Sequence, residues 1–368
     1  MKLTFPDCLS MVVAAGKTRC VSMSARILLV TGILGGFLSI CTAAEPAVIW
    51  SVPSPAASKQ DSRNQEIRLR WINDEELFAL RRGGIVGKYH CEKKKTLWEK
   101  RFALVCGFAA SPTAVYLIEE QDSAQFSRHL VEIGGGDGLA VRMWPQEKLG
   151  KYAHQDSLAL HNLEWLPDPG LLAIESLQMN RSDAWFFDPR ADAFRGKVNL
   201  GGYLWESSSD GKSLVWVHNG IIRQAKPGEL EFAVVWDSGL GEGGDDHPGM
   251  RAYQVGTDGG FAAVLDNGGW QGGARLFHRE GAAGKVEMAT ISHENESLHS
   301  VAVDMQHQRI WLSTGTTGWF GCFDFSGKLV ASTDGLSAKN IWAIAVAPSG
   351  KRAAVVDSTG TLSFIELR

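Results

Sequence analysis

Cysteine is scarce in this chain, and its placement argues against a disulfide framework. Six cysteines occur among the 368 residues. Half of them lie before residue 45: Cys8, Cys20 and Cys41. The other three, Cys91, Cys106 and Cys322, are far apart in the sequence and form no Cys-x-x-Cys pair. The sequence therefore excludes a disulfide scaffold and a cysteine zinc or redox pair, and it predicts buried free thiols.

Long runs of one charge are missing as well. The formal net charge is −4, and the densest basic cluster, Lys93–Lys95, falls in an expected hairpin turn. We therefore expect no nucleic-acid partner. The chain also has no Gly-x-Ser-x-Gly motif and no phosphate-binding loop of the Gly-x-x-x-x-Gly-Lys-Ser/Thr type. These absences exclude the serine-hydrolase elbow and the common nucleotide-binding loop.

The longest apolar run covers residues 27–40 and follows Arg26. Such a run suits the core of a signal peptide and is too short for a membrane-spanning helix of about 20 residues. We therefore expect residues 1–44 to be a signal peptide that is cleaved before Glu45, with Met23 as the alternative start. The mature chain would then be secreted or periplasmic and would have no transmembrane span. A lipid anchor on Cys41 is the less favoured alternative, because the residue before this cysteine is not small.

A repeated hairpin dominates the rest of the chain. Each copy has a short apolar strand, a tight polar turn and a second apolar strand. The seven copies are LRWINDEELFAL, GFAASPTAVYLI, LEWLPDPGLLAI, YLWESSSDGKSLVWV, AYQVGTDGGFAAV, VAVDMQHQRIWLS and IAVAPSGKRAAVV. Their turns lie about 46 residues apart on average, which is the length of one propeller blade.

A second hairpin follows each of the first six copies and completes four strands per repeat. The seventh copy is followed by one strand only, TLSFIEL, but the segment AVIWSVP at residues 47–53 can supply the missing one. We therefore predict one all-β domain over residues 45–368. It would be a seven-bladed β-propeller of four-stranded antiparallel blades, closed by an N-terminal strand that pairs with the last blade.

Two connections between blades are longer than the others, at residues 145–157 and 239–250, and we expect both to be loops. The second contains Asp245, Asp246 and His247 among glycines. Because calcium takes six to eight oxygen ligands from flexible loops, these residues are weak candidates for calcium or another divalent cation. Their spacing matches no known calcium loop, and a solvated acidic loop is the alternative. No other cofactor is expected.

The hairpins resemble those of known propeller families. The segment IAVAPSGKRAAVVDSTGTLSFIEL is typical of bacterial WD-repeat-like propellers. Two other segments, GGIVGKYHCEKKKTLWEKRF and GCFDFSGKLVAS, are similar to the repeats of quinoprotein-like propellers. The resemblance covers Ala47 to Leu367 and implies an architecture, which serves many unrelated functions. The Trp-Asp pair that recurs in true WD repeats occurs once here, at Trp236-Asp237.

Polar residues begin several of the strands that should line the central channel of a propeller. They are Arg68, His161, Asn162, Arg251, His299 and Asn340. Convergent polar side chains at a channel mouth can bind a small ligand, whereas the alternative is that they only meet channel water. His161 and His299 could also move protons or hold a metal ion, and Arg251 could orient a substrate.

Two tryptophans differ from the rest because they lie in glycine-rich connections. Trp270 and Trp319 occur in NGGWQ and GTTGW, between the second and third strands of adjacent blades. If exposed, they could stack on a sugar or on a protein partner. The other tryptophans lie in or beside expected strands, where packing between blades explains them.

These observations favour an exported, non-enzymatic propeller that binds a protein or saccharide partner through one face. The alternative is a hydrolase or lyase of the lactonase or sugar-processing type at the channel mouth, with or without a divalent metal ion. A quinoprotein-like assembly factor is a third hypothesis. Convergence of His161, His299 and Arg251 would favour the enzyme, and their separation would favour the binding protein. The sequence leaves the oligomeric state open.

Overall fold

The structure is a computed structural model, in which Ala43–Arg368 form one compact unit. The residues that it describes are 45–54, 67–122, 127–153, 158–178, 181–200, 204–208, 211–218, 220–239, 250–256, 258–266, 274–291, 298–314, 318–334, 336 and 340–366.

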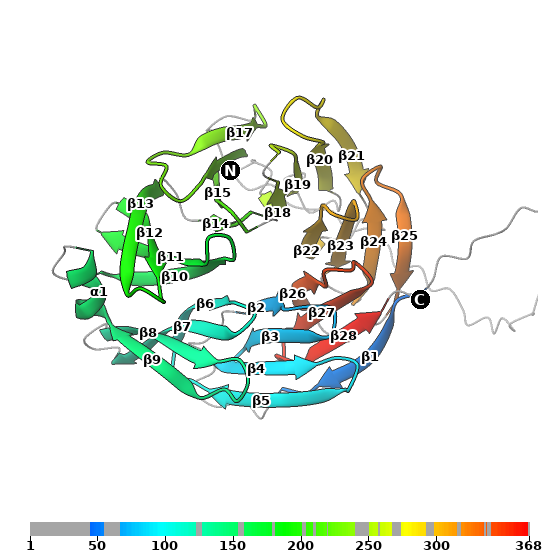
Figure 1. Cartoon of the computed structure of the whole chain (residues 1–368). Helices are drawn as coiled ribbons and strands as arrows, with labels where there is room; N and C mark the ends of the chain where they lie inside the picture. Colours follow the sequence, from blue (N-terminus) through cyan, green and yellow to red (C-terminus); the bar gives the residue numbers. More distant parts are fainter. Residues whose placement is uncertain are drawn as a thin grey trace, which may run out of the picture. The chain divides into compact units, whose positions relative to one another are not determined.

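The strands within these ranges form seven sheets, each with four antiparallel strands, arranged around a ring (Figure 1). Blade 1 contains β2 (Arg68–Trp71), β3 (Glu76–Arg81), β4 (Ile85–His90) and β5 (Lys95–Arg101). Blade 2 contains β6 (Val105–Ala110), β7 (Ala114–Asp122), β8 (Ser127–Gly134) and β9 (Ala140–Pro145), and the helix α1 (Gln146–Tyr152) follows it. Blade 3 contains β10 (Leu160–Leu166), β11 (Leu171–Gln178), β12 (Arg181–Asp188) and β13 (Ala193–Leu200).

The remaining blades follow in chain order. Blade 4 contains β14 (Leu204–Ser207), β15 (Leu214–His218), β16 (Ile221–Ala225) and β17 (Ala233–Asp237). Blade 5 contains β18 (Met250–Val255), β19 (Phe261–Asp266), β20 (Ala274–Arg279) and β21 (Glu287–Ile291). Blade 6 contains β22 (Leu298–Asp304), β23 (Arg309–Thr314), β24 (Phe320–Asp324) and β25 (Leu329–Thr333). Blade 7 contains β26 (Ile341–Val346), β27 (Arg352–Asp357), β28 (Leu362–Glu366) and β1 (Ala47–Val52).

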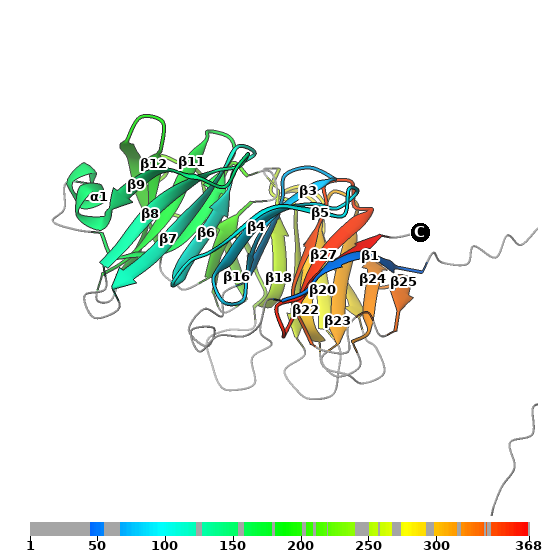
Figure 2. The ribbon, with the colours of Figure 1, turned by 90° about the horizontal axis from the view of Figure 1, so that it is seen from below.

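The ring is closed by strands from the two ends of this domain. β1 pairs antiparallel with β28, and Trp50 lies opposite Phe364. Their rings stack with centroids 5.1 Å apart and an interplanar angle of 10°. Figure 2 shows β1 in blue beside the red and orange strands of blade 7. The predicted seven-bladed fold and its closure by the N-terminal strand are confirmed.

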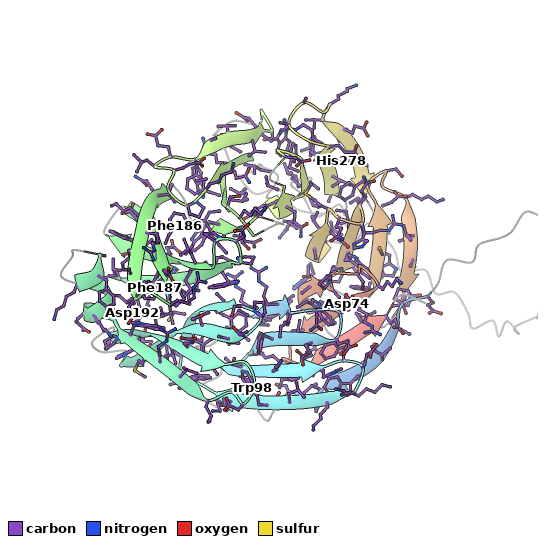
Figure 3. All side chains as sticks on the ribbon, in the orientation of Figure 1. Asp74, Trp98, Phe186, Phe187, Asp192 and His278 are labelled. Atoms are coloured by element: carbon purple, nitrogen blue, oxygen red, sulfur yellow. The ribbon has the colours of Figure 1, made fainter. Side chains whose placement is uncertain are left out.

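The hydrophobic core lies between the blades. Among the described residues, seven clusters of buried apolar side chains occur, one at each junction of neighbouring blades. Phe187 of β12 packs between blades 2 and 3, whereas the preceding residue, Phe186, packs between blades 3 and 4 (Figure 3). Successive side chains of a strand point to opposite faces, so each blade contributes to two clusters.

Burial on both faces explains the composition of the middle strands. In β27 the four residues Ala353 to Val356 are all buried, and β3 is buried from Leu77 to Arg81. A strand covered on both faces needs a continuous apolar run rather than an alternating pattern. The outer strand β5 alternates more, with Trp98 buried and its neighbours exposed or half-buried, because one side reaches the rim.

The structure differs from the prediction at residues 145–157, where a loop was expected. Residues 146–152 form the helix α1, with Glu147 in its first turn and Lys151 in its last. Both charges suit the helix dipole, and the buried side chain of Leu149 anchors the helix to the core between blades 2 and 3. In the described part of the chain, no helix is long and apolar enough to cross a membrane.

The three cysteines after residue 45 are free, as predicted. Cys91 and Cys322 are buried, and Cys106 is half-buried. Burial raises the pKa of the Cys322 thiol to about 12 and also raises that of Cys91. Since the thiolate is the reactive form, these two residues are structural.

Candidate functional site

The first strand of each blade is the innermost, as predicted for a propeller. β6 contacts β10, β22 contacts β26, and β2 contacts β26. Figure 3 shows the side chains of the inner strands gathered around the centre of the ring. Polar side chains on these short strands can therefore meet although they come from distant parts of the sequence.

The two histidines predicted at the channel mouth have separate partners. His161 of β10 lies with Nδ1 3.3 Å from Oε2 of Glu175 in its own blade. His299 of β22 lies with Nδ1 2.7 Å from the carbonyl oxygen of Ile341, in blade 7. Among the described contacts, none joins the two imidazoles. They lie in blades 3 and 6, so the structure gives no support for a shared acid–base or metal site.

The other four predicted mouth residues are also engaged locally. Arg68 opens β2 and Arg251 lies at the start of β18, and both have interaction partners. The side-chain oxygen of Asn162 accepts a hydrogen bond from the backbone N–H of Leu163 at 2.9 Å. The backbone carbonyl of Asn340 accepts one from the N–H of Ser358 at 2.7 Å.

The expected exposure of Trp319 is wrong. Its indole is only 3% exposed and packs in the core between blades 5 and 6, with its ring 6.1 Å from that of Phe323. The glycines around it are the physical reason. A Cβ on Gly321 would lie 2.2 Å from the Trp319 ring, so the glycine makes room for the indole. Trp270, Asp245, Asp246 and His247 lie outside the described residues, and their predicted roles stay predictions.

A polar network that sequence analysis missed lies in the channel. A guanidinium N–H of Arg70, on β2, forms an ion pair with the carboxylate of Glu164, on β10. The same guanidinium nitrogen, Nη2, donates to the hydroxyl of Ser207 at 3.3 Å, and that hydroxyl donates to Glu164 at 3.3 Å. These residues belong to blades 1, 3 and 4. The network therefore joins three blades across their inner strands.

Two more groups lie within electrostatic range of this network, on the inner strands of blades 4 and 5. Glu206 of β14 exposes part of its surface to solvent, and the protein around it removes water from the rest. Burial, and then the charge of Glu164, raise its pKa, while Arg68 and Arg70 oppose that rise. Burial and the charges of Glu206 and Glu164 raise the pKa of Tyr253 well above its usual value. The site thus holds two carboxyl groups in different environments beside a neutral phenol.

A weak sequence signal for these residues does exist. The predicted mouth residues begin the inner strands, and in a strand the residue two positions later lies on the same face. Applied to Arg68 and Arg251, this period of two points to Arg70 and Tyr253. Nothing local indicates that Glu164 and Glu206 face the same space, because they are 42 positions apart.

Replacing Glu206 by glutamine is expected to raise the melting temperature at pH 8. The pKa of Glu206 is raised on folding, so folding favours the protonated carboxyl group. The stability that this group contributes therefore falls as the pH rises from the usual carboxyl range through the folded pKa, and the amide lacks that loss. Calorimetry at pH 8 and pH 4 checks this, because the gain should shrink at pH 4. The exposed Glu231→Gln variant is the control, and a Glu206→Gln variant less stable than wild type at pH 8 would contradict the prediction.

Two pockets lie away from the channel. One, of about 490 Å³, lies between blades 3 and 4 and is lined by Trp216, Arg223 and Phe232, among others. The other, of about 530 Å³, lies between blades 5 and 6 and includes His278 and His307. In the described part of the chain, no three His, Cys, Asp or Glu side chains come together in a way that could hold a metal ion.

The outer rim carries a row of exposed apolar side chains. On and beside β9, Leu139, Val141 and Met143 are 58%, 60% and 45% exposed. They lie within five residues of one another along this edge, where Val141 forms a β-bulge. β9 ends the order β6-β7-β8-β9 in its sheet, so one of its edges pairs with no strand in the described ranges. We call these three residues the β9 stripe.

The comparisons with known proteins identify a fold and no family. No family model matches the sequence, and no curated protein matches it. The crystal structure of the Cps50 (Swd1) β-propeller domain of Myceliophteria thermophila matches with a TM-score of 0.59 and 11% sequence identity. The match covers 88% of this chain and 100% of that domain. At this identity the likeness concerns the fold alone, and the chain is a seven-bladed propeller similar in fold to a WD40-type domain.

Proposed function

We propose that this chain is a protein-binding scaffold and that the β9 stripe is the surface that meets the partner. The observation that carries the proposal is the stripe itself: three neighbouring apolar side chains, each at least 45% exposed, on and beside the edge strand β9, which pairs with β8 on one side only among the described strands. An open strand edge is a template for strand pairing, and in β9 that edge is interrupted once, by the bulge at Val141. A partner strand would bury the stripe and bind the free backbone groups of β9.

The stripe differs from the rest of the rim. Other outer strands carry single exposed apolar residues, such as Val234 on β17, Met288 on β21 and Leu329 on β25. Single residues of this kind are ordinary on a protein surface and need no partner. A contiguous row of exposed apolar residues is not ordinary, and it marks an interaction site. The WD40-type neighbour is compatible with a scaffold of this kind.

Two findings favour a protein over the other proposed ligands. Stacking on a saccharide would have used Trp319, which is buried in the core. A hydrolase or lyase at the channel mouth would have used His161 and His299, which have separate partners in different blades. Export, with residues 1–44 as a cleaved signal peptide, remains part of the proposal and is supported by the apolar run at 27–40.

The test is an affinity enrichment from an extract of the source cells with three forms of the protein. Wild type is compared with Val141→Asp, which charges the stripe, and with Met288→Asp, which charges a matched exposed position on blade 5. We expect one protein to be enriched by wild type and by Met288→Asp, and Val141→Asp to bind that purified protein at least about tenfold more weakly. All three forms should melt at similar temperatures, because the substituted side chains are exposed.

A partner that Val141→Asp binds as tightly as wild type would overturn the assignment of the stripe. Failure of wild type to enrich any protein would overturn the scaffold function.

A further inference from the structure

The pocket at the junction of blades 3 and 4 has the size and the lining of a small-ligand site. Its volume is about 490 Å³, and pockets that bind small molecules have about 300–1,000 Å³. It is lined by Asn199 of β13 and by Trp216, Arg223, Leu230, Glu231 and Phe232 of blade 4. The rings of Trp216 and Phe232 lie with their centroids 6.0 Å apart, and the side chain of Leu230 is 79% exposed. The pocket thus offers an apolar surface to a ligand.

The positive charge in this pocket belongs to Arg223 of β16. Its guanidinium carbon lies 4.5 Å from the centroid of the Trp216 ring. The two residues are directly opposite each other in the neighbouring strands β16 and β15, so strand pairing supports this stacking. Because the indole covers one face of the guanidinium, the N–H groups at its edge are the part that can bind a ligand.

Arg223 differs from another stacked arginine of this chain because no carboxylate neutralises its charge. Arg142 lies 4.8 Å from the centroid of Trp144 and also forms an ion pair with Glu132 at 2.7 Å. Arg223 is half-buried, and in the described part of the chain it stacks on its ring without an ion pair or a hydrogen bond. Its N–H donors are therefore available to an acceptor that a ligand brings.

The acidic residues near the pocket limit how much negative charge it can accept. Glu231 lines the pocket, is exposed and forms no ion pair with Arg223. The carboxylate of Glu229 accepts a hydrogen bond of 2.6 Å from the backbone N–H of Lys226 in its own turn. One guanidinium beside one acidic side chain suits a ligand with a single negative charge.

We propose that this pocket binds a small organic carboxylate with an apolar body. The carboxylate would accept bidentate hydrogen bonds from the Arg223 guanidinium, and the apolar body would lie against Phe232 and Leu230. Stacking on Trp216 holds the guanidinium in place before the ligand arrives, which reduces the entropy lost on binding. The pocket lies between blades 3 and 4, whereas the β9 stripe lies on blade 2. The site therefore goes beyond the scaffold function and does not depend on it.

Other ligand classes fit the same residues less well. Arg223 would repel a cation, and it already occupies the Trp216 ring on which a cation could stack. A phosphate group carries more negative charge than a carboxylate, so Glu231 would oppose it more strongly. A neutral apolar molecule would remove water from Arg223 without offering an acceptor to its N–H groups.

The test is calorimetric titration of the full chain with sodium hydrocinnamate, a carboxylate on a phenylpropyl skeleton. Hydrocinnamyl alcohol lacks the charge, phenylpropylamine hydrochloride reverses it, and sodium acetate lacks the apolar body. The peptide acetyl-Gly-Gly-Phe carries its carboxylate at the end of a chain. We expect hydrocinnamate to bind wild type more tightly than any of these four parallel probes.

Four variants are compared with wild type. Arg223→Gln should bind hydrocinnamate at least about tenfold more weakly, because charge-assisted hydrogen bonds are lost. Arg223→Lys should show a smaller loss, since the ammonium keeps the charge without the planar fork. Leu230→Ser should bind about threefold more weakly, because it removes apolar surface. The control Lys93→Gln removes the same charge at an exposed turn of blade 1 and should bind like wild type.

The melting temperature of each variant separates loss of binding from loss of folding. Arg223 forms no hydrogen bond in the described part of the chain, and Leu230 is exposed, so we expect all variants to melt close to wild type. If Arg223→Gln is unstable, Arg223→Lys and Leu230→Ser still test the site.

Three results would overturn the proposal. The first is the absence of binding of hydrocinnamate to wild type at millimolar concentration. The second is equal binding by wild type and by a folded Arg223→Gln or Arg223→Lys variant. The third is equal or tighter binding of another probe. The alcohol would then indicate an apolar pocket, the amine a cation site, acetate a simple anion site, and the peptide a site for the C-terminus of a protein partner.

Discussion

Removal of residues 45–53 is expected to abolish cooperative folding of the propeller or to lower its stability drastically. This deletion removes β1, and with it the pairing of Ala47–Val52 with β28. Val52 is buried, while Ile49 and Trp50 are partly buried against blades 7 and 1. Burying one such side chain stabilises a fold by about 1.5–3 kcal/mol, so the three contribute roughly 5 kcal/mol. That is comparable with the whole stability of many domains, about 5–15 kcal/mol.

The loss of β1 also exposes an edge that the closed ring conceals. Leu362, Phe364 and Ile365 of β28 are buried in the intact ring, and the deletion leaves their strand unpaired on one side. We therefore expect aggregation in addition to destabilisation. Urea denaturation followed by tryptophan fluorescence and light scattering checks both effects. The matched control is a chain that begins at Glu45 and keeps β1. Equal denaturation midpoints for the two chains would show that the ring does not depend on β1.

Substitution of Arg81 by methionine is expected to reduce the free energy of unfolding by about 3–5 kcal/mol. Arg81 of β3 is 1% exposed and lies at the junction where the ring closes. Its Nη1 donates to the carbonyl oxygens of Val52, Pro53 and Gly360, at 3.3, 3.2 and 3.2 Å. Val52 is the last residue of β1, Pro53 follows it, and Gly360 lies in the turn before β28. One arginine of blade 1 thus holds both segments that close blade 7.

The contacts of the second guanidinium nitrogen, Nη2, explain why the expected loss of stability is large. Nη2 forms an ion pair with Glu99, which also accepts a hydrogen bond of 2.6 Å from the Tyr89 hydroxyl. Without Arg81, a partly buried carboxylate and three carbonyl groups lose their donor.

A double-mutant cycle measures this contribution. Chemical denaturation is compared for wild type, Arg81→Met, Glu99→Gln and the double variant, and the double variant should lose less stability than Arg81→Met, because no unpaired charge remains. Arg190→Ala, at a side chain that is 72% exposed, is the control and should change stability by less than about 0.5 kcal/mol. If Arg81→Met reduces the free energy of unfolding by less than about 1 kcal/mol, the contacts of Arg81 are not important for ring closure.

The hairpin repeat was visible in the sequence because its signals are local. Each copy places apolar strands around a polar turn, as in IAVAPSGKRAAVV, and neighbouring strands of a blade are neighbours in the chain. Closure by AVIWSVP followed from counting strands, although β1 and β28 lie at opposite ends of the domain.

The errors of the sequence analysis also have local causes. α1 is only seven residues long, and Leu149 is the only residue of its apolar side that is large and buried, so its helical period is too weak to recognise. Trp319 follows Gly318, and glycine-rich segments suggest exposure. In this case the glycines serve packing, because Gly318 has φ of 68° and Gly321 leaves space for the indole.

The sequence by itself determined the architecture of this protein: the number of blades, their four strands, the closing strand and the free cysteines. Hairpin pairing and the alternation of side chains act over a few residues, so a single sequence records them. Only the tertiary structure decided which polar residues meet. Arg70, Glu164, Ser207 and Tyr253 come from four blades, and they share the channel because ring closure brings their inner strands together. Residues that meet across the ring show no regular spacing in the sequence. The candidate sites depend on such contacts, so the sequence alone does not reveal them.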